Sequence, residues 1–557
     1  TSSGFNGGGE ILIGGNYLGK GPEPNASATV ILEGAAITAD ALNNGDGGRV
    51  IVWSDDYTNF QGSITAKGAS DGKGGFVETS SKDNLQAFGS VDASGGIAPG
   101  EWLLDPADVT IGTSTTGGTY SDLFYPSSTT ATVQASTIIT ALENNHVTIS
   151  TNSGAAEAGN AGTITITSSL ANINTNSGGR RLTFFAAEDI NVNNTISSTG
   201  GPLKVRLRAQ GDVIIANNAD IITNGGDFIV SGANDIGDPD TEFSFNSSAG
   251  SFKLSSGSDI NTTGAADAAG GDVTIDTSVR STSITGTSTG DIEIFGNITT
   301  SGGTATSTGQ AGGDVTLTAG INTLSGTTTT TNGQIIIDAG GNITATGSNA
   351  GGSSNATGGA GGAVTLNTNG ENITLIDANI STGGGAKAAS GTDGAGGNIS
   401  IQDPLRVGSG TADATNTLDT GATAGNITFS GAIDGHDPSS LPGAASLSNF
   451  DDHLVLASGT GSFTFGGNIG DTLALTSLSI NATAGSGTAD FTVPQLGGGG
   501  SVGVTGAVNL GNASGGHITF SGNGANAFDI GGKLTLNSAG GADSFKFTND
   551  ATITADG

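Results

Sequence analysis

The chain contains no cysteine and no methionine. Without cysteine it cannot form disulfides, thiolate metal sites or a thiol nucleophile. No apolar run approaches the roughly 18–20 residues of a membrane-spanning helix, so membrane insertion is not expected. The first residues, TSSGFNGGGEILIGG, lack the charged and apolar regions of a signal peptide. Because strand-like patterns continue to both ends, we expect the sequence to be an excerpt of a longer protein.

Charged residues are also scarce, at 12% of the chain, so Thr, Ser and Asn must cover much of the surface. Lys and Arg together number 16 against 50 Asp and Glu, which gives a formal net charge of −34. A chain this acidic repels nucleic acid and anionic membranes, so neither is an expected partner. The basic residues form no patch in the sequence, and GGRRL at 178–182 is their densest spot.

Glycine is abundant, with 99 residues, and Ser, Thr, Asn and Ala accompany it, a mixture that disfavours helices. The glycines do not recur at every third position and prolines number only 11, which excludes collagen. Regularly spaced β-branched residues, as in GTITITS (162–168) and GQIIIDAG (333–340), argue against disorder. Alternation of apolar and polar residues at period two predicts short strands with one buried face.

An internal repeat predicts the fold. AGGDVTI at 269–275 returns as AGGDVTL at 311–317, and the looser TGDIEI at 289–294 lies midway between them. We interpret this interval as two rungs, and rungs of about 20 residues with two or three short strands predict an all-β, right-handed parallel β-helix. The Leu-x-x-Leu-x-Leu spacing of leucine-rich repeats is missing. Glycine-rich inserts, at 349–362 and 381–397, should loop out from one side.

The Gly-Asp or Gly-Asn step before each strand has a local explanation. We expect the glycine to take a positive φ at a corner, and the Asp or Asn to bond the backbone two residues further on. Stacked Asn side chains could bond one another, whereas stacked carboxylates would repel. Phe residues at 184–185, 463–465 and 520 should pack in the core.

Two stretches, 133–149 and 434–461, depart from the repeat. Residues 133–149 predict a short amphipathic helix with Ser136 as N-cap and Ile138, Ile139 and Leu142 on its apolar side. The resulting division is a β-helix at 1–112, a linker with the helix at 113–160, a shaft at 161–433, an irregular insert at 434–461 and a continuing shaft at 462–557.

Residues 46–106 carry the most distinctive pattern, GDGGRVIVWSDDYTNFQGSITAKGASDGKGGFVETSSKDNLQAFGSVDASGG followed by GEWLLDP. This passage resembles the filamentous-haemagglutinin-like exoproteins of two-partner secretion. The matching residues are Gly47, Gly48, Val50, Val52, Trp53, Asp55, Phe60, Gly62, Ile64, Ala66, Lys67, Gly68, Gly74, Gly75, Phe76, Val77, Glu78, Ser80, Lys82, Leu103, Leu104, Asp105 and Pro106. The helix and the strand at 146–149 follow in the family's order, whereas the downstream repeats are similar to the family only in style.

The resemblance implies a right-handed β-helical shaft that is exported through an outer-membrane transporter and serves as an adhesin or surface fibre. It places the protein outside the cell or on the outer surface of a Gram-negative-type bacterium. The secretion domain of the family is missing from this sequence, so the export route is an inference.

Catalytic chemistry finds little support in the sequence. Asp55-Asp56, Asp451-Asp452-His453 and GHD at 435–437 are the candidates for acid–base catalysis, as in β-helical polysaccharide-degrading enzymes. Neighbouring residues of a strand face opposite sides, so a bare Asp-Asp pair does not converge on one substrate. We therefore expect no enzyme and name no catalytic, cofactor-binding or metal-binding residue.

Metal ions and glycans remain as possible modifiers of the surface. Asp272, Asp291 and Asp314 on successive rungs could attract Ca²⁺ weakly and nonspecifically, and no cofactor is expected. The scattered histidines at 146, 436, 453 and 517 do not predict a zinc or haem site. The sequons at Asn297, Asn342, Asn372 and Asn426 match the N-glycosylation motif. The repeat alone also explains them, because it places Asn at a corner, Ile in the core and Thr on the surface.

These observations predict the structural and adhesive shaft of a large fibrous adhesin, which attaches through many weak loop contacts. Its expected partners are a host or neighbouring cell surface, a glycan or matrix, or further copies of itself. A self-assembling filament or sheath subunit is the alternative, and a polysaccharide-degrading enzyme is the second one.

Overall fold

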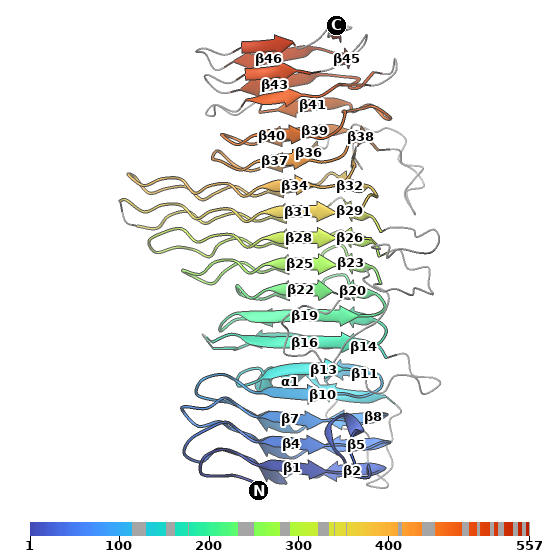
Figure 1. Cartoon of the computed structure of the whole chain (residues 1–557), viewed down its shortest axis with the longest axis vertical. Coiled ribbons are helices and arrows are strands. Elements are labelled where there is room, and N and C mark those ends of the chain that lie inside the picture. The colour runs from blue at the N-terminus through green and yellow to red at the C-terminus, as the bar shows by residue number, and fades with distance from the viewer. Residues whose placement is uncertain are drawn as a thin grey trace. The chain divides into compact units, whose positions relative to one another are not determined.

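The computed structural model describes the chain except for residues 114–129, 152–161, 177, 232–249, 279–289, 321–332, 339, 353, 410–414, 437–451, 482–489, 498–501, 513–516, 522–527, 539–543, 548–552 and 556–557. It divides into two units, the first built from Thr1–Gly250 and the second from Ser251–Arg280 and Thr287–Gly557. In each unit short strands stack in parallel, rung upon rung (Figure 1). The predicted parallel β-helix is confirmed; its right-handed sense stays a prediction.

The first unit has three columns of strands. The first sheet contains, in hydrogen-bonded order, β1 (Glu10–Ile13), β4 (Arg49–Val52), β7 (Phe76–Thr79), β10 (Glu101–Leu104), β13 (His146–Ser150), β16 (Arg180–Ala186), β19 (Leu203–Ala209) and β22 (Phe228–Ser231). The second sheet contains β2 (Ala28–Ile31), β5 (Tyr57–Phe60), β8 (Asn84–Ala87), β12 (Ala131–Gln134), β11 (Val109–Gly112), β14 (Ile164–Ile166), β17 (Ile190–Val192) and β20 (Val213–Ile215). The third column contains β3 (Ala36–Thr38), β6 (Ser63–Thr65), β9 (Ser90–Asp92), helix α1 (Ala135–Ala141), β15 (Leu170–Ile173), β18 (Ile196–Ser198) and β21 (Ile221–Ile222), and a short 3-10 turn, η1 (Tyr17–Gly19), follows β1.

The second unit repeats this plan. Its first sheet contains β25 (Val273–Asp276), β28 (Val315–Thr318), β31 (Val364–Asn367), β34 (Ile399–Ile401), β37 (Ile427–Phe429) and β40 (Phe463–Phe465). Its second sheet contains β23 (Phe252–Leu254), β26 (Ile292–Ile294), β29 (Ile335–Ile337), β32 (Ile373–Ile376), β35 (Leu405–Gly408) and β38 (Ile433–Gly435). Its third sheet contains β24 (Ile260–Asn261), β27 (Ile298–Thr299), β30 (Ile343–Thr344), β33 (Asn379–Ser381), β36 (Thr415–Asp419), β39 (His453–Ala457), β41 (Ser477–Ile480), β43 (Val508–Asn512) and β46 (Leu534–Ser538). Shorter sheets are formed by β42 (Phe491–Val493), β44 (His517–Phe520) and β47 (Ser544–Phe547), and by β45 (Phe528–Ile530) and β48 (Ile553–Ala555).

The predicted rung of about 20 residues fits only part of the chain. In the first unit Val205 pairs with Phe228, 23 residues further on, whereas the repeat that contains the AGGDVT motifs has a longer rung. Val273 pairs in register with Val315, and the whole interval between the two AGGDVT motifs is therefore one rung instead of two. Ile292, interpreted from the sequence as the start of another rung, begins β26 in the second sheet of the same rung. The Gly-Asp motif occurs at more than one corner of the same rung, so the spacing between motifs is shorter than a rung.

Apolar residues at alternate positions face the interior of each unit. Val273 and Ile275 of β25 are fully buried, while Thr274 between them is partly exposed. Phe184, Phe185, Phe463 and Phe520 are buried as predicted, whereas Phe465 is partly exposed, so the prediction was wrong for it. The rung therefore forms because Val, Ile and Phe can cover the same residue types in the rungs above and below.

Close packing between rungs, rather than positive φ, explains most of the Gly-Gly steps. A Cβ on Gly313 would lie 2.2 Å from the carbonyl oxygen of Gly271, and one on Gly397, which precedes Asn398, would lie 2.0 Å from that of Gly362. Neither residue has a positive φ, so the predicted reason was wrong for them. It holds at Gly290 of the intervening motif, where φ is 65°.

The Asp and Asn side chains bond the next rung rather than their own. Asp272 Oδ1 accepts the backbone N–H of Asp314 at 2.8 Å, and Asp314 Oδ1 accepts that of Ala363 at 2.7 Å. Asn297 Oδ1 accepts from the Asn342 side chain at 3.1 Å, which forms the predicted Asn ladder. Asp and Asn alternate here because the position requires only an acceptor oxygen.

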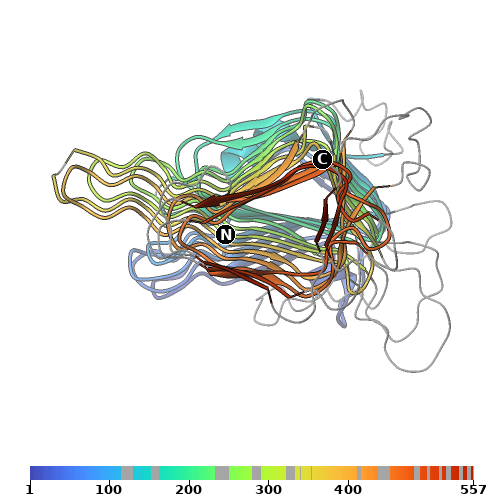
Figure 2. The same cartoon turned by 90° about the horizontal axis from the view of Figure 1, so that it is seen from above.

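Glycine-rich loops between the third and first sheets of the second unit stack on one another and project to one side (Figure 2). This loop stack consists of 262–272, 300–314, 345–363 and 382–398, and it contains the two predicted inserts. Backbone bonds join its layers, for example from Gly302 N–H to the Thr346 carbonyl at 2.9 Å and from Gly347 N–H to the Gly383 carbonyl at 3.0 Å. The Oγ1 of Thr300 closes one loop base on the Gly313 carbonyl at 2.6 Å.

Helix α1 replaces strands in the third column of the first unit. It contacts both β9 and β15. Because a helix is about 10 Å wide and strands are about 4.8 Å apart, α1 fills the height of two rungs. The second sheet fills the same two rungs with β12 and β11, which pair in the reverse of their chain order. The first sheet continues from β10 directly to β13.

The predicted helix is confirmed, but its predicted cap is wrong. Gln134 is the N-cap and makes no side-chain capping bond, while Ser136 lies inside the helix and is exposed. Ile138 and Leu142 are buried as expected, and Ile139 is only partly buried. Of the predicted insert at 434–461, residues 437–451 lie outside the described part, and 453–457 form strand β39.

Candidate functional site

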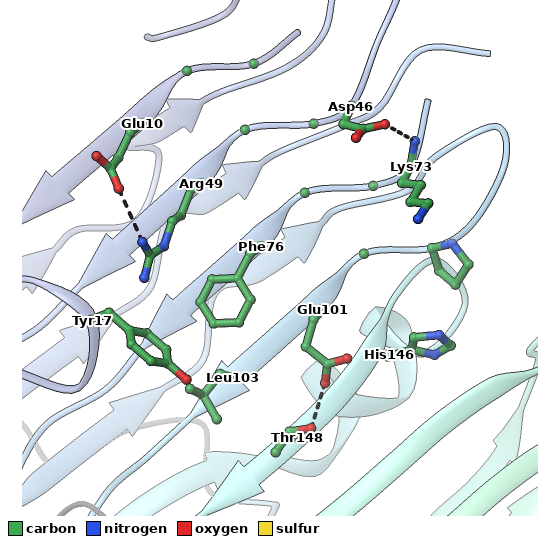
Figure 3. A pocket seen from close by; sticks show the side chains of 18 of the residues that line it. Glu10, Tyr17, Asp46, Arg49, Lys73, Phe76, Glu101, Leu103, His146 and Thr148 are labelled. Atoms are coloured by element: carbon green, nitrogen blue, oxygen red, sulfur yellow. Dashed lines mark hydrogen bonds and ion pairs between the residues drawn. The ribbon is translucent and has the colours of Figure 1, made fainter. Parts of the chain in front are cut away.

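A groove of about 1080 Å³ crosses the outer surface of the first sheet in the first unit (Figure 3). A column of its side chains comes from the first residue of successive strands. Glu10 is opposite Arg49, and Arg49 is opposite Phe76. Phe76 is in turn opposite Glu101, which is opposite His146. The parallel register therefore turns residues far apart in the sequence into one continuous column.

Glycines form the bare edge of the groove. Gly48, Gly75 and Gly100 occupy equivalent positions just before β4, β7 and β10. A Cβ on Gly48 would lie 2.2 Å from the Gly9 carbonyl oxygen, and a Cβ on Gly75 or Gly100 would lie 2.1 Å from the next carbonyl in the stack. No side chain fits there, so the backbone itself lines this edge.

The charged side chains of the column are paired with one another. Arg49 Nη1 lies 3.5 Å from Glu10 Oε1, and both side chains are largely exposed. Arg181 Nη2 lies 2.8 Å from Glu101 Oε2, and these side chains are only 15% and 19% exposed. Thr148 Oγ1 donates to the other oxygen of Glu101 at 2.6 Å. The groove thus carries charges of both signs that largely compensate one another.

His146 is a neutral member of the column. Its Nδ1 accepts the backbone N–H of Arg181 at 3.1 Å. Burial and the positive charges of Arg181 and Arg180 lower the pKa of His146 to about 4. The imidazole is therefore uncharged at neutral pH and contributes a polar, unprotonated ring to the groove.

Two aromatic rings face the middle of the groove. The centroids of Tyr17 and Phe76 are 5.7 Å apart, with the ring planes at 71° to each other. The Arg49 guanidinium carbon lies 5.1 Å from the Tyr17 centroid and 5.8 Å from that of Phe76. This stacking holds the guanidinium over the rings while Arg49 still reaches Glu10. Phe76 lies between Arg49 and Glu101 (Figure 3).

A buried polar cluster supports the segment that carries Tyr17. Both carboxylate oxygens of Glu78 lie 3.3 Å from the backbone nitrogen of Leu18, which donates its N–H to them. Leu18 has a φ of 54°, unusual for a residue other than glycine. Burial, followed by the charge of buried Asp105, raises the pKa of Glu78 to about 8. Glu78 is accordingly protonated at neutral pH.

The other end of the same segment is fastened near Trp53. Asp55 Oδ1 accepts from Asn25 Nδ2 at 2.9 Å and from the Trp53 indole N–H at 3.3 Å. The indole ring fills the space beneath Gly15 and Gly19, where a Cβ would meet it at 2.6 Å and 2.5 Å. Residues 14–27, which we call the strap, are therefore held by side chains that also carry the family resemblance.

The acidic candidates from the sequence take different positions in the described residues. Asp55 holds the strap, and its neighbour Asp56 is exposed. Asp452 is buried and accepts the backbone N–H of His436 at 3.2 Å, a proximity that the sequence did not predict. His453 contacts Ser477 Oγ at 2.6 Å, on a neighbouring strand of the third sheet. Asp451 lies outside the described residues.

The metal and modification candidates have structural partners. Asp272, Asp291 and Asp314 each accept a backbone N–H from the adjacent rung, at 2.7–2.8 Å. No group of three or more His, Asp and Glu side chains suited to a metal ion occurs among the described residues. Of the sequon asparagines, Asn297 and Asn342 are engaged in the Asn ladder.

The basic residues gather more than the sequence indicated. β16 and β19 lie side by side, and Arg181 pairs in register with Lys204. Arg206 and Arg208 lie on the same strand as Lys204 and are nearly fully buried. The Arg208 guanidinium carbon lies 4.7 Å from the Phe185 ring centroid. Strand pairing therefore brings the basic residues of two separate runs together, and Arg181 and Lys204 are ion-paired with Glu101 and Asp227.

None of the groove residues was identified from the sequence as functional. A signal was available, because Glu10, Arg49 and Phe76 each follow a Gly-Gly pair directly, and Glu101 follows Pro-Gly. Aligning the chain on these pairs would have placed the column in register.

Among the described residues, no helix has the length and apolarity needed to cross a membrane. Neither a protein-family model nor a curated protein sequence matches the chain.

Proposed function

We propose that this chain is the shaft of a secreted or cell-surface adhesin of the filamentous-haemagglutinin-like type, and that it binds surfaces without catalysing a reaction. The groove on the first sheet carries this proposal. Six successive strands contribute a side chain to it, from Glu10 on β1 to Arg181 on β16. A long open groove of this kind suits an extended ligand held through many modest contacts.

The arrangement around the groove supports a binding role. The strap is fastened at Leu18 and Asn25, and its Tyr17 ring forms part of the groove wall. A binding surface needs side chains whose positions are fixed before the ligand arrives. Arg49 meets this condition because it is held by Glu10 and by two aromatic rings.

The loop stack contains the glycine-rich inserts, where the sequence predicted the surface contacts. Its layers are joined through their backbones, and close approaches such as Gly347 to the Gly359 carbonyl leave no room for larger side chains. Closely packed glycine backbone offers fewer distinct side-chain contacts than the groove. We therefore assign attachment first to the groove and treat the loop stack as a spacer.

The proposal is tested by adhesion of beads coated with the whole 557-residue chain. Coated beads are counted on cell layers and on extracellular matrix under flow, with Phe76→Ala and Arg49→Gln as groove variants. Phe5→Ala is the matched control, because Phe5 is an aromatic residue of the same unit that is 65% exposed outside the groove. Adhesion should fall for the groove variants alone. Equal adhesion of all four proteins would contradict a role for the groove.

A further inference from the structure

We infer that the groove binds a linear, uncharged polysaccharide that lies lengthwise along the column from Glu10 to Arg181. This inference rests on the proposed function of the groove and adds the chemical class of its ligand. Charge, hydrogen-bonding capacity, aromatic surface and length lead to it independently.

The charge of the groove favours an uncharged ligand. Three acidic residues (Glu10, Asp46 and Glu101) and three basic residues (Arg49, Lys73 and Arg181) line it. Two acid–base pairs are already formed, at 3.5 Å and 2.8 Å. A polyanion would have to displace Glu10 or Glu101 from its arginine, at the cost of leaving a carboxylate without its partner. A hydroxyl can bond such a pair without separating it, because it both donates and accepts.

The hydrogen bonds of the sheet disfavour a peptide. In a parallel stack the strand N–H and C=O groups point along the column to the neighbouring strands, as in the pairing of β4 with both β1 and β7. A peptide lying in the groove would therefore find few backbone partners for its own polar groups. The available donors and acceptors are side chains such as Glu101, Arg181 and Thr148, and they suit scattered hydroxyls.

The aromatic rings supply the apolar contact that a sugar ring needs. Tyr17 and Phe76 are both partly exposed and line the groove together with Leu103. The C–H face of a sugar can pack on such rings while its hydroxyls point outward to charged groups. Aromatic and arginine side chains of this kind commonly carry most of the energy of a binding surface.

The length of the groove favours a chain over a single sugar. Its column spans six strands, so five spacings of about 4.8 Å give a length of about 24 Å. A linear oligosaccharide of several residues can extend over that distance. Affinity should therefore rise with the number of sugar residues until the oligosaccharide fills the column, and then level off.

The test is calorimetric titration of the whole chain with two sets of probes. The uncharged probes are linear β-1,4-glucan, β-1,4-xylan and α-1,4-glucan oligosaccharides of increasing length, and the polyanionic probe is a heparin oligosaccharide. At least one uncharged series should bind with length-dependent affinity that changes little with added salt. Phe76→Ala should weaken that binding roughly tenfold or more, whereas Phe5→Ala should leave it unchanged.

Two further measurements separate the possible failures. Phe76→Leu keeps the bulk of the side chain but removes the ring, so loss of binding with an unchanged melting temperature identifies a ligand contact rather than a folding defect. Salt-sensitive heparin binding with no binding of any uncharged series overturns the ligand class, and bead adhesion that still depends on Phe76 then leaves the proposed function standing. If no groove variant changes either bead adhesion or oligosaccharide binding, both the ligand class and the proposed function of the groove are overturned.

Discussion

The carboxyl group of Glu78 on β7 accepts the backbone N–H of Leu18, a residue 60 positions earlier in the chain, with both oxygens at 3.3 Å from the Leu18 nitrogen. This contact fastens the strap over the outer surface of the first sheet. Buried Asp105 lies close enough to raise the pKa of Glu78 further. A side chain of the first sheet thus holds the segment that shapes the groove.

The protonation of Glu78 makes the stability of the folded chain dependent on pH. Its pKa is about 8 in the folded chain against 4.5 for an ordinary Glu. The folded chain therefore keeps a proton that the unfolded chain releases, and the stability that this proton supplies is complete below pH 4.5 and is lost as pH rises towards 8. The limiting slope is about 1.4 kcal/mol per pH unit. Thermal unfolding between pH 5 and 9 should show a steeper decline for the wild type than for Glu78→Gln; parallel curves would contradict it.

The glycine stack of the second unit predicts a position-specific effect of one methyl group. In Gly313→Ala the new Cβ would lie 2.2 Å from the Gly271 carbonyl oxygen, so the rungs must move apart. We expect a loss of about 1–3 kcal/mol in the free energy of unfolding. Gly352→Ala is the control, because nothing lies within 4 Å of its added Cβ. Urea unfolding of the two variants measures the difference, and equal losses would refute the packing explanation.

The acceptor role of Asp314 predicts that charge is dispensable at this position. Asp314→Asn keeps an oxygen for the Ala363 N–H and removes repulsion from Asp272, so its stability should equal or slightly exceed that of the wild type. Asp314→Ala removes the acceptor and should cost about 1 kcal/mol. Hydrogen exchange of the Ala363 amide gives a local measure. Faster exchange in both variants would show that the charge itself matters.

Substitutions at two positions of helix α1 should differ strongly in their effect on the free energy of unfolding. Ile138 is fully buried, and Ile138→Ala should lower the free energy of unfolding by about 2–4 kcal/mol. Ser136 is exposed and is not the helix cap, so Ser136→Ala should change it by less than about 0.5 kcal/mol. Denaturant unfolding of both variants tests this difference. A large effect at Ser136 would restore the cap predicted from the sequence.

Local features of the fold could be read from the sequence with success. The alternation Val273-Thr274-Ile275 predicted one buried and one exposed face, and it could do so because the side-chain period of a strand is two residues. The helix near Ile138 was recognisable from its apolar spacing. The rung length was not, because the Gly-Asp step before Ile292 looks the same in sequence as the one before Val273 although the two lie at different corners.

Composition and alternation are local properties, and they were enough to establish a stack of parallel strands with glycine corners. Which residues share a surface depended on the folded chain. Glu10, Arg49, Phe76 and Glu101 became one groove through strand register, and register depends on the lengths of the loops between strands. The same holds for Glu78 and Leu18, whose contact requires the strap to fold back across the sheet. Contacts between rungs form only when the chain has coiled into the solenoid, so the sequence of a single repeat does not reveal them.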